Sequence, residues 1–245
     1  MESDVLEIAG IIIMAFIVLG VHELGHLITG IWQGFRFELF VVGPLGVKRE
    51  EGKVKVYFNK NLQYYGGVAA TIPLDDRPEN SKKFGNILIA GPIASLIFAA
   101  IMGGIYYLFQ FPYDKVILTG ALISVGIFFA TTIPSKSGVF FSDRKRYQRL
   151  NSSGPEREVE LAILRIMGIY GRDNSYVNIN PADIQLMVDD PDFKLFGLFN
   201  KLCYQYQKFN AFDPETEEAY KAASKDKPKS FVKVLDKEIE KIQES

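Results

Sequence analysis

Three long apolar runs dominate the first 133 residues of the chain, at about residues 8–32, 84–110 and 116–133. On a helix with a rise of 1.5 Å per residue, the first run is about 37 Å long, enough to cross a hydrocarbon core of about 30 Å. It is too long for the apolar region of a signal peptide and follows no basic residues. The pattern therefore predicts three transmembrane helices.

The residues between the first two runs, 34–83, follow a different pattern. Segments 35–42 and 53–58 are rich in β-branched and aromatic residues, and turn residues occupy 43–46 and 50–52. Polar and apolar side chains alternate in the second segment, which is typical of a strand with one apolar face. This region predicts a small β-hairpin insertion.

The pattern of residues 150–245 predicts a soluble helical domain. Proline marks three helix starts, at Gly154-Pro155, Asn180-Pro181 and Asp213-Pro214. Apolar side chains then recur three or four positions apart in three sets: Val159, Ile163, Ile166 and Tyr170; Leu195, Phe199, Leu202, Tyr206 and Phe209; Val232, Leu235, Ile239 and Ile242. This spacing favours a packed helical core over a ligand site, although the domain could bind a cytosolic regulator.

Together these patterns predict a mostly α fold with two domains. Residues 1–149 would form a three-helix transmembrane core with the β-hairpin insertion, and residues 150–245 the C-terminal cytosolic helical domain.

The distribution of basic residues predicts the orientation in the membrane. Residues 34–85 contain nine Lys and Arg, residues 1–8 contain none, and the turn before the third run contains Lys115. By the positive-inside rule, the N-terminus lies outside, and the insertion and the C-terminal domain lie in the cytoplasm. The basic run Arg144–Arg149 would contact anionic lipid headgroups.

Composition excludes some classes of protein. The net charge is −1, which gives no indication of nucleic-acid binding. Cys203 is the single cysteine, so an internal disulfide is excluded, and a reducing compartment fits that part of the chain.

The first run contains the segment His22-Glu23-Leu24-Gly25-His26, which holds both histidines of the chain. On a helix, His22 and His26 share a face one turn apart and can bind one Zn²⁺. Glu23 can then act as general base toward an attacking water. The alternative is a pair of structural histidines, but ionisable groups are costly inside a membrane and usually mark a functional site.

This pentad within a transmembrane run resembles the site-2 protease family of intramembrane zinc metalloproteases, whose first core helix carries His-Glu-x-x-His. The segment Ala90-Gly91-Pro92-Ile93-Ala94-Ser95 is similar to the family's Ala-Gly-Pro-x-x-Asn signature, with Ser95 in the place of Asn. Thr131-Thr132-Ile133-Pro134 takes the place of Asn-x-x-Pro in the third helix motif, Asn-x-x-Pro-x-x-x-Leu-Asp-Gly. The resemblance covers residues 8–145.

The resemblance implies that an aspartate completes the metal site. Asp143 is the first acidic residue after Pro134, although the spacing is longer than in the family motif and Arg144 replaces the glycine. A loop that begins at Ser135 could re-enter and place Asp143 at the metal. The alternative is that Asp143 is the N-cap of a basic helix, which would leave Asp75 and Asp76 as the next ligand candidates.

The resemblance also implies an activity, the hydrolysis of peptide bonds in or near the transmembrane segments of membrane-protein substrates. His22, His26 and Asp143 would hold one Zn²⁺, Glu23 would be the general base, and Ser95 and Thr131 would assist substrate or oxyanion binding. The β-rich insertion would present the substrate as an added strand.

One other function is compatible with part of the sequence, and another is disfavoured by it. A non-proteolytic membrane protein of the same fold, acting as a binding or regulatory partner, would agree with the altered third motif. A zinc transporter would need acidic or histidine residues spread over several spans, which this chain lacks.

Overall fold

The structure is a computed structural model that describes residues 2–50, 52–109, 114–138 and 140–244. The chain forms two compact units. Unit 1 comprises Met1–Thr71, Lys83–Ser135 and Phe141–Tyr147, and unit 2 comprises Ile72–Lys82, Lys136–Phe140 and Gln148–Ser245. The insertion is therefore divided, since its last residues belong to the unit that contains the C-terminal helices.

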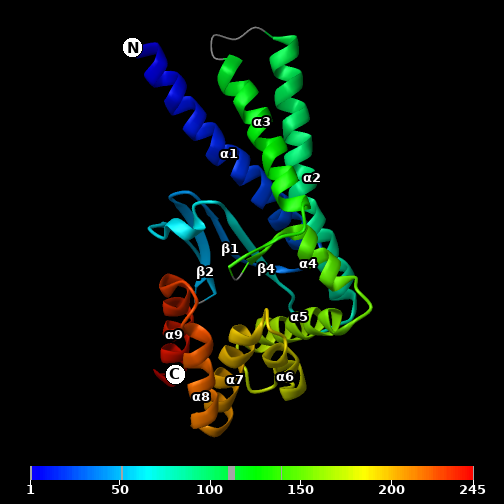
Figure 1. Cartoon of the computed structure of the whole chain (residues 1–245), viewed down its shortest axis with the longest axis vertical. Helices are drawn as coiled ribbons and strands as arrows, with labels where there is room; N and C mark the ends of the chain where they lie inside the picture. The colour runs from blue at the N-terminus through cyan, green and yellow to red at the C-terminus, as the bar shows by residue number, and fades with distance from the viewer. Residues whose placement is uncertain (1, 51, 110–113, 139, 245) are drawn as a thin grey trace. The chain divides into compact units, whose positions relative to one another are not determined.

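The three predicted apolar segments are helices, α1 (Glu2–Trp32), α2 (Glu79–Leu108) and α3 (Asp114–Thr132), as Figure 1 shows. Each is long and apolar enough to cross a membrane. Helix α2 begins at Glu79, earlier than the predicted start at 84. The predicted end of this run at 110 lies outside the described residues.

Close contacts at glycines define how these helices run. A Cβ added at Gly10 would lie 3.1 Å from the side chain of Val116, and one at Gly120 would lie 2.8 Å from that of Met14, so α1 and α3 are parallel. A Cβ at Gly25 would lie 2.7 Å from the carbonyl oxygen of Ala90, so α1 and α2 nearly touch. The end of α3 therefore lies at the same end of the bundle as the C-terminal half of α1.

Residues 36–42 and 53–58 are strands, as predicted, but the insertion is a four-stranded sheet and not a single hairpin. Its strands are β1 (Arg36–Val42), β2 (Leu45–Glu50), β3 (Lys53–Phe58) and β4 (Val68–Ile72), in the order β3-β2-β1-β4. The unpredicted strand β2 pairs antiparallel with both β1 and β3. Its glycine and charged residues indicated a turn, but hydrogen bonding from both neighbours makes it a strand.

The sheet packs along the half of α1 that contains the histidines. A Cβ at Gly43, in the turn between β1 and β2, would lie 2.4 Å from the ring of Phe16. At the other end, a Cβ at Gly30 would lie 2.4 Å from Thr71 of β4. Val41 between them is fully buried. The sheet therefore covers α1 from Phe16 to Gly30.

A short segment joins α3 to the C-terminal helices. It contains the two-residue strands β5 (Lys136–Ser137) and β6 (Phe140–Phe141), which pair with each other, and the helix α4 (Asp143–Leu150).

The helices after residue 150 confirm the three predicted starts. They are α5 (Pro155–Asp173), α6 (Pro181–Asp189), α7 (Lys194–Phe209), α8 (Pro214–Ser224) and α9 (Lys229–Glu244). The Asn180 side chain accepts a hydrogen bond from the N–H of Ala182 at 3.0 Å, and Asp213 accepts one from Thr216 at 3.2 Å. Most members of the predicted apolar sets are buried, but Tyr170, Tyr206, Val232 and Ile239 are partly exposed and Phe209 is 63% exposed.

Arg149 is buried in unit 2, with 1% of its surface exposed. Its guanidinium forms ion pairs with Glu156, Glu160, Asp190 and Asp192 at 2.8–3.2 Å, and Glu160 is fully buried as well. The prediction that the whole basic run contacts lipid headgroups was therefore wrong for Arg149. Its charge stabilises carboxylates inside the unit.

Arg149→Met should lower the free energy of unfolding of unit 2 by about 3–5 kcal/mol, because it leaves the buried Glu160 carboxylate without its cation. Cys203 is the single cysteine and is 1% exposed, so its reaction with a thiol-reactive dye during heating of the full chain in detergent measures this unfolding.

Arg172→Met is the matched control, because Arg172 pairs with Asp173 at the surface. Equal shifts in the unfolding temperature of the two variants would contradict a special role for the buried network.

Candidate metal centre

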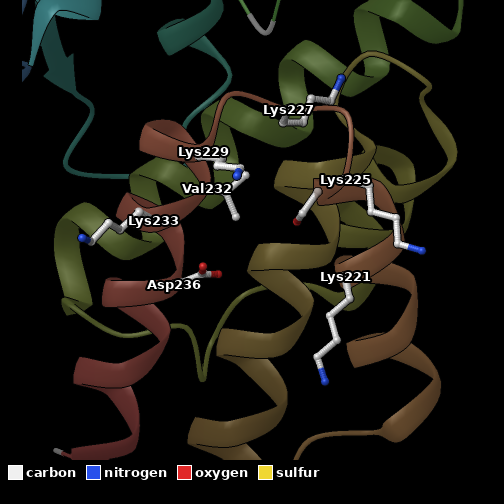
Figure 2. Close-up of a pocket in the computed structure, with 8 residues that line it drawn as sticks. Lys221, Lys225, Lys227, Lys229, Val232, Lys233 and Asp236 are labelled. Atoms are coloured by element: carbon white, nitrogen blue, oxygen red, sulfur yellow. The ribbon is translucent and has the colours of Figure 1, made fainter.

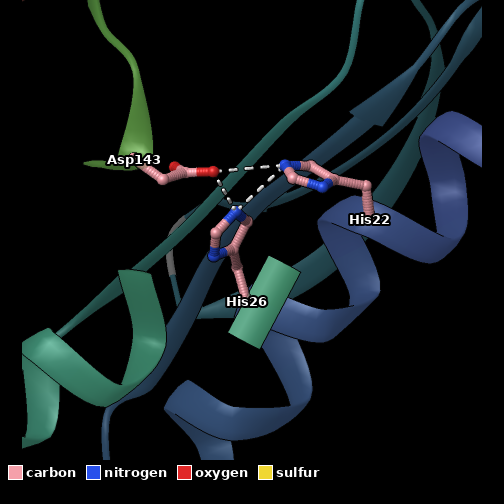
Figure 3. A group of neighbouring side chains, drawn as sticks. All are labelled: His22, His26 and Asp143. Carbon is pink, nitrogen blue, oxygen red and sulfur yellow. Dashed lines mark hydrogen bonds and ion pairs between the residues drawn. The ribbon is translucent and has the colours of Figure 1, made fainter. Parts of the chain in front are cut away.

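Helix α1 presents the His22 and His26 rings on one face, with their Nε2 atoms 3.3 Å apart. Asp143, in the first turn of α4, lies opposite them (Figure 3). Its Oδ2 atom is 3.4 Å from the Nε2 atom of each histidine. The structure thus brings together the three predicted ligands, which are far apart in sequence.

Ser142 determines where Asp143 lies. Its Oγ donates to the carbonyl oxygen of Ile133 at 2.9 Å and accepts from the N–H of Ser135 at 3.0 Å, so it closes the loop after α3. The same Oγ accepts the N–H of Lys145 at 3.4 Å and caps α4. The predicted alternative, Asp143 as the N-cap, disagrees with this arrangement, because Ser142 fills that position and the Asp143 side chain points at the histidines.

The other ring nitrogen of each histidine is hydrogen-bonded to α2. His26 Nδ1 lies 2.7 Å from the carbonyl oxygen of Ile87, and His22 Nδ1 lies 2.9 Å from Oγ of Ser95. A carbonyl oxygen can only accept, so His26 Nδ1 carries a hydrogen. In the neutral ring, Nε2 of His26 then presents its lone pair toward Asp143.

These three side chains fit a zinc ion. Asp143 Oδ2 is buried and accepts no hydrogen bond from the described residues. When the ring is neutral, a carboxylate oxygen 3.4 Å from its lone pair is repelled, and a metal cation between the two would remove this repulsion. Ligand atoms about 2.0–2.1 Å from a tetrahedral zinc lie about 3.3–3.4 Å from one another, and the three separations found here agree with that value.

Glu23 lies next to this group and against the sheet. A Cβ added at Gly67, just before β4, would lie 2.8 Å from its Oε1, and the backbone of Ala69 in β4 hydrogen-bonds to its carboxylate. It is also close enough to His22, His26 and Asp143 for electrostatic interaction. The carboxylate is thus held between the candidate ligands and one edge of the sheet.

The other predicted site residues have partners of their own. Ser95 is fully buried and hydrogen-bonded to His22. The Thr131 hydroxyl donates to the carbonyl oxygens of Ile127 and Phe128 in its own helix. Their predicted contact with substrate or oxyanion stays a prediction.

The alternative ligands Asp75 and Asp76 both lie in unit 2. Asp75 pairs with Arg77 at 2.7 Å, and the hydrogen bond from Arg77 holds the pKa of the Asp75 carboxyl at about 2. Asp76 lies 3.9 Å from Arg172. The Asp75 carboxylate is therefore already paired with the Arg77 guanidinium.

Sequence reasoning missed the part that α2 plays around His26. A Cβ added at Gly91 would lie 2.2 Å from His26 Nε2, so only glycine leaves room for the ring. Ile87, whose carbonyl binds the same ring, is one turn earlier on α2. The glycine of the Ala-Gly-Pro segment could have indicated that another group packs closely against α2 at this position.

Gly91→Ala should abolish zinc binding by the purified protein, because the new methyl group overlaps the His26 ring and displaces Nε2. Gly104→Ala in the same helix is the control, since a Cβ there meets no atom within 4 Å. Metal analysis after gel filtration measures zinc per chain. Full zinc content in Gly91→Ala would contradict the placement of His26.

Unit 2 has a cavity of about 370 Å³ between α8 and α9. It is lined by Lys221, Ser224, Lys225, Lys227, Lys229, Val232, Lys233 and Asp236. Figure 2 shows the ammonium ends of Lys221, Lys225 and Lys227 pointing apart, as solvated lysines do. Asp236 accepts a hydrogen bond from the Tyr220 hydroxyl at 2.9 Å. We assign no ligand to this cavity.

Comparison with known protein families gives a match. The sequence model of peptidase family M50 matches residues 10–243, which is nearly the whole chain and includes His22, Glu23, His26 and Asp143. No curated protein and no solved structure matches the chain.

Proposed function

The chain belongs to peptidase family M50, and on this premise we propose that it is an intramembrane zinc metalloprotease. Its reaction would be the hydrolysis of peptide bonds in or near transmembrane segments of membrane-protein substrates. The observation that carries the proposal is the group of three ligand atoms, 3.3–3.4 Å apart, on a helix long and apolar enough to cross a membrane.

Each residue of the centre has a distinct role in this proposal. His22, His26 and Asp143 would hold the zinc ion through Nε2, Nε2 and Oδ2. When bound there, zinc polarises a peptide carbonyl and makes a water molecule easier to deprotonate. The Glu23 carboxylate takes the proton from the attacking water and passes it to the nitrogen of the leaving amine. Its contacts with β4 hold it beside the centre for both transfers.

The sheet supports a mode of substrate binding. Strand β4 is at one edge of the sheet, and Gly67 and Ala69 at its start contact Glu23. A substrate segment added beside β4 as an extended strand would pass its backbone close to the Glu23 carboxylate. An extended backbone also exposes the scissile carbonyl, which a helix would keep hydrogen-bonded.

The apolar surface of unit 1 supports a location in the lipid bilayer. Large apolar side chains on α1 and α2 are exposed, among them Ile12, Ile13, Ile97 and Ile101. In water this surface would be unfavourable, whereas in hydrocarbon it is well solvated. The N-terminus would lie outside and the C-terminal helices in the cytoplasm, where they could bind a regulator.

Glu23→Gln should retain one zinc per chain and lose cleavage of a model transmembrane substrate in detergent or liposomes. Cleavage is lost because glutamine cannot take the proton from water. Zinc is retained because residue 23 is not one of the proposed zinc ligands. Asp143→Asn should lose both zinc and cleavage, because a neutral amide oxygen is a poor zinc ligand. Metal analysis and gel-based cleavage, done on the same preparations, separate the two effects.

Asp75→Asn is the control for the loss of a carboxylate and should keep both properties. Cleavage by Glu23→Gln at the wild-type rate would overturn the assigned mechanism. Wild-type protein that binds zinc but cleaves no membrane substrate would favour the alternative of a non-proteolytic binding partner.

The orientation can be tested by cysteine labelling in a Cys203→Ser background. Cysteine at Asp114, at the start of α3, should react with an impermeant maleimide added to intact cells. Cysteine at the exposed Asp226 should react only after lysis. Labelling in the reverse pattern would invert the proposed topology.

A further inference from the structure

We propose that Ser95 is a positioning residue that fixes the tautomer and the ring orientation of His22 for zinc binding. This inference rests on the proposed zinc site. It assigns to Ser95 a role different from the substrate contact expected from the sequence, and the structure gives three observations for it.

The first observation is a row of groups on one face of α2. Ile87, Gly91 and Ser95 are spaced four residues apart, so they lie one above another on the helix. Ile87 hydrogen-bonds His26, Gly91 makes room for the same ring, and Ser95 hydrogen-bonds His22. Because α1 and α2 are antiparallel, this row faces the two histidines in reverse order. A single helix face therefore holds both rings.

The second observation is the chemistry of the Ser95 contact. For His22 to offer the Nε2 lone pair to a metal, the hydrogen of the neutral ring must be on Nδ1. Ser95 Oγ lies 2.9 Å from that atom and can accept this hydrogen, as the Ile87 carbonyl does for His26. Hydrogen-bond partners of this kind orient metal-binding histidines in many proteins. Both rings are thereby held with Nε2 toward Asp143.

The third observation is burial. Ser95 has no exposed surface, so its hydroxyl can act on a substrate only through another group. Ser124 of α3, which is fully buried too, donates a hydrogen bond to the backbone carbonyl of Ser95 at 2.8 Å. It reaches the Ser95 backbone and leaves the Ser95 hydroxyl free to bond His22. Ser95 therefore acts through the imidazole ring.

Ser95→Ala removes the acceptor and leaves the Nδ1–H of His22 buried without a partner. The ring can then rotate, or shift its hydrogen to Nε2, and either change removes a zinc ligand for part of the time. We expect zinc affinity to fall about 10- to 100-fold, the usual effect of losing such a partner.

The experiment measures the zinc affinity of the full chain in detergent by competition with a chromophoric chelator. The variants are Ser95→Ala, Ser95→Thr, which keeps a hydroxyl, and Ser124→Ala. Ser124→Ala is the matched control, because it removes a fully buried serine hydroxyl that does not contact a histidine. The absorption spectrum of the Co²⁺-loaded protein reports ligand geometry, and the reactivity of Cys203 during heating reports folding.

The expected result is weaker zinc binding and an altered Co²⁺ spectrum in Ser95→Ala alone, with affinity restored in Ser95→Thr. Equal affinities in Ser95→Ala and Ser124→Ala would overturn the inference, and so would equal affinities in Ser95→Ala and Ser95→Thr. If wild-type protein bound no zinc, the proposed function itself would fail, and this result is distinct from the other two.

Discussion

Three atoms that could bind a metal ion converge in this molecule. The imidazole nitrogens of His22 and His26 and the carboxylate oxygen of Asp143 lie 3.3–3.4 Å apart. With both imidazole rings neutral, three lone pairs face one another in a largely buried place, and a bound cation would relieve their repulsion. Much of unit 1 can be understood as the structure that holds these atoms together.

The small residues that let α1 and α2 pack closely also allow hydrogen bonds from α2 to the two histidines. Gly25 lets α1 approach the backbone of α2, and Gly91 leaves space for the His26 ring. At this short distance the Ile87 carbonyl and the Ser95 hydroxyl reach the histidines directly. Small residues in membrane helices are usually explained by packing alone. Here they also allow the hydrogen bonds to Nδ1 that leave Nε2 of each ring facing Asp143.

Features set by local sequence could be predicted, and features set by tertiary contacts could not. The apolar runs and the proline helix starts depend on neighbouring residues, and the structure has helices at these places. The pair His22 and His26 follows from helical spacing. Strand β2 was missed because its neighbours in the sheet, and not its own residues, make it a strand. The hydroxyl of Ser142 could not be recognised either, because its role depends on Ile133 and Ser135 being folded back toward it.

Zinc-edge X-ray absorption of the purified full chain would reveal the composition of the proposed metal centre. We expect nitrogen and oxygen neighbours at about 2.0–2.1 Å, outer-shell scattering from two imidazole rings, and no sulfur. A sulfur neighbour at about 2.3 Å would contradict it, since Cys203 is the single cysteine and lies outside the centre. Zinc bound without imidazole scattering would contradict it equally.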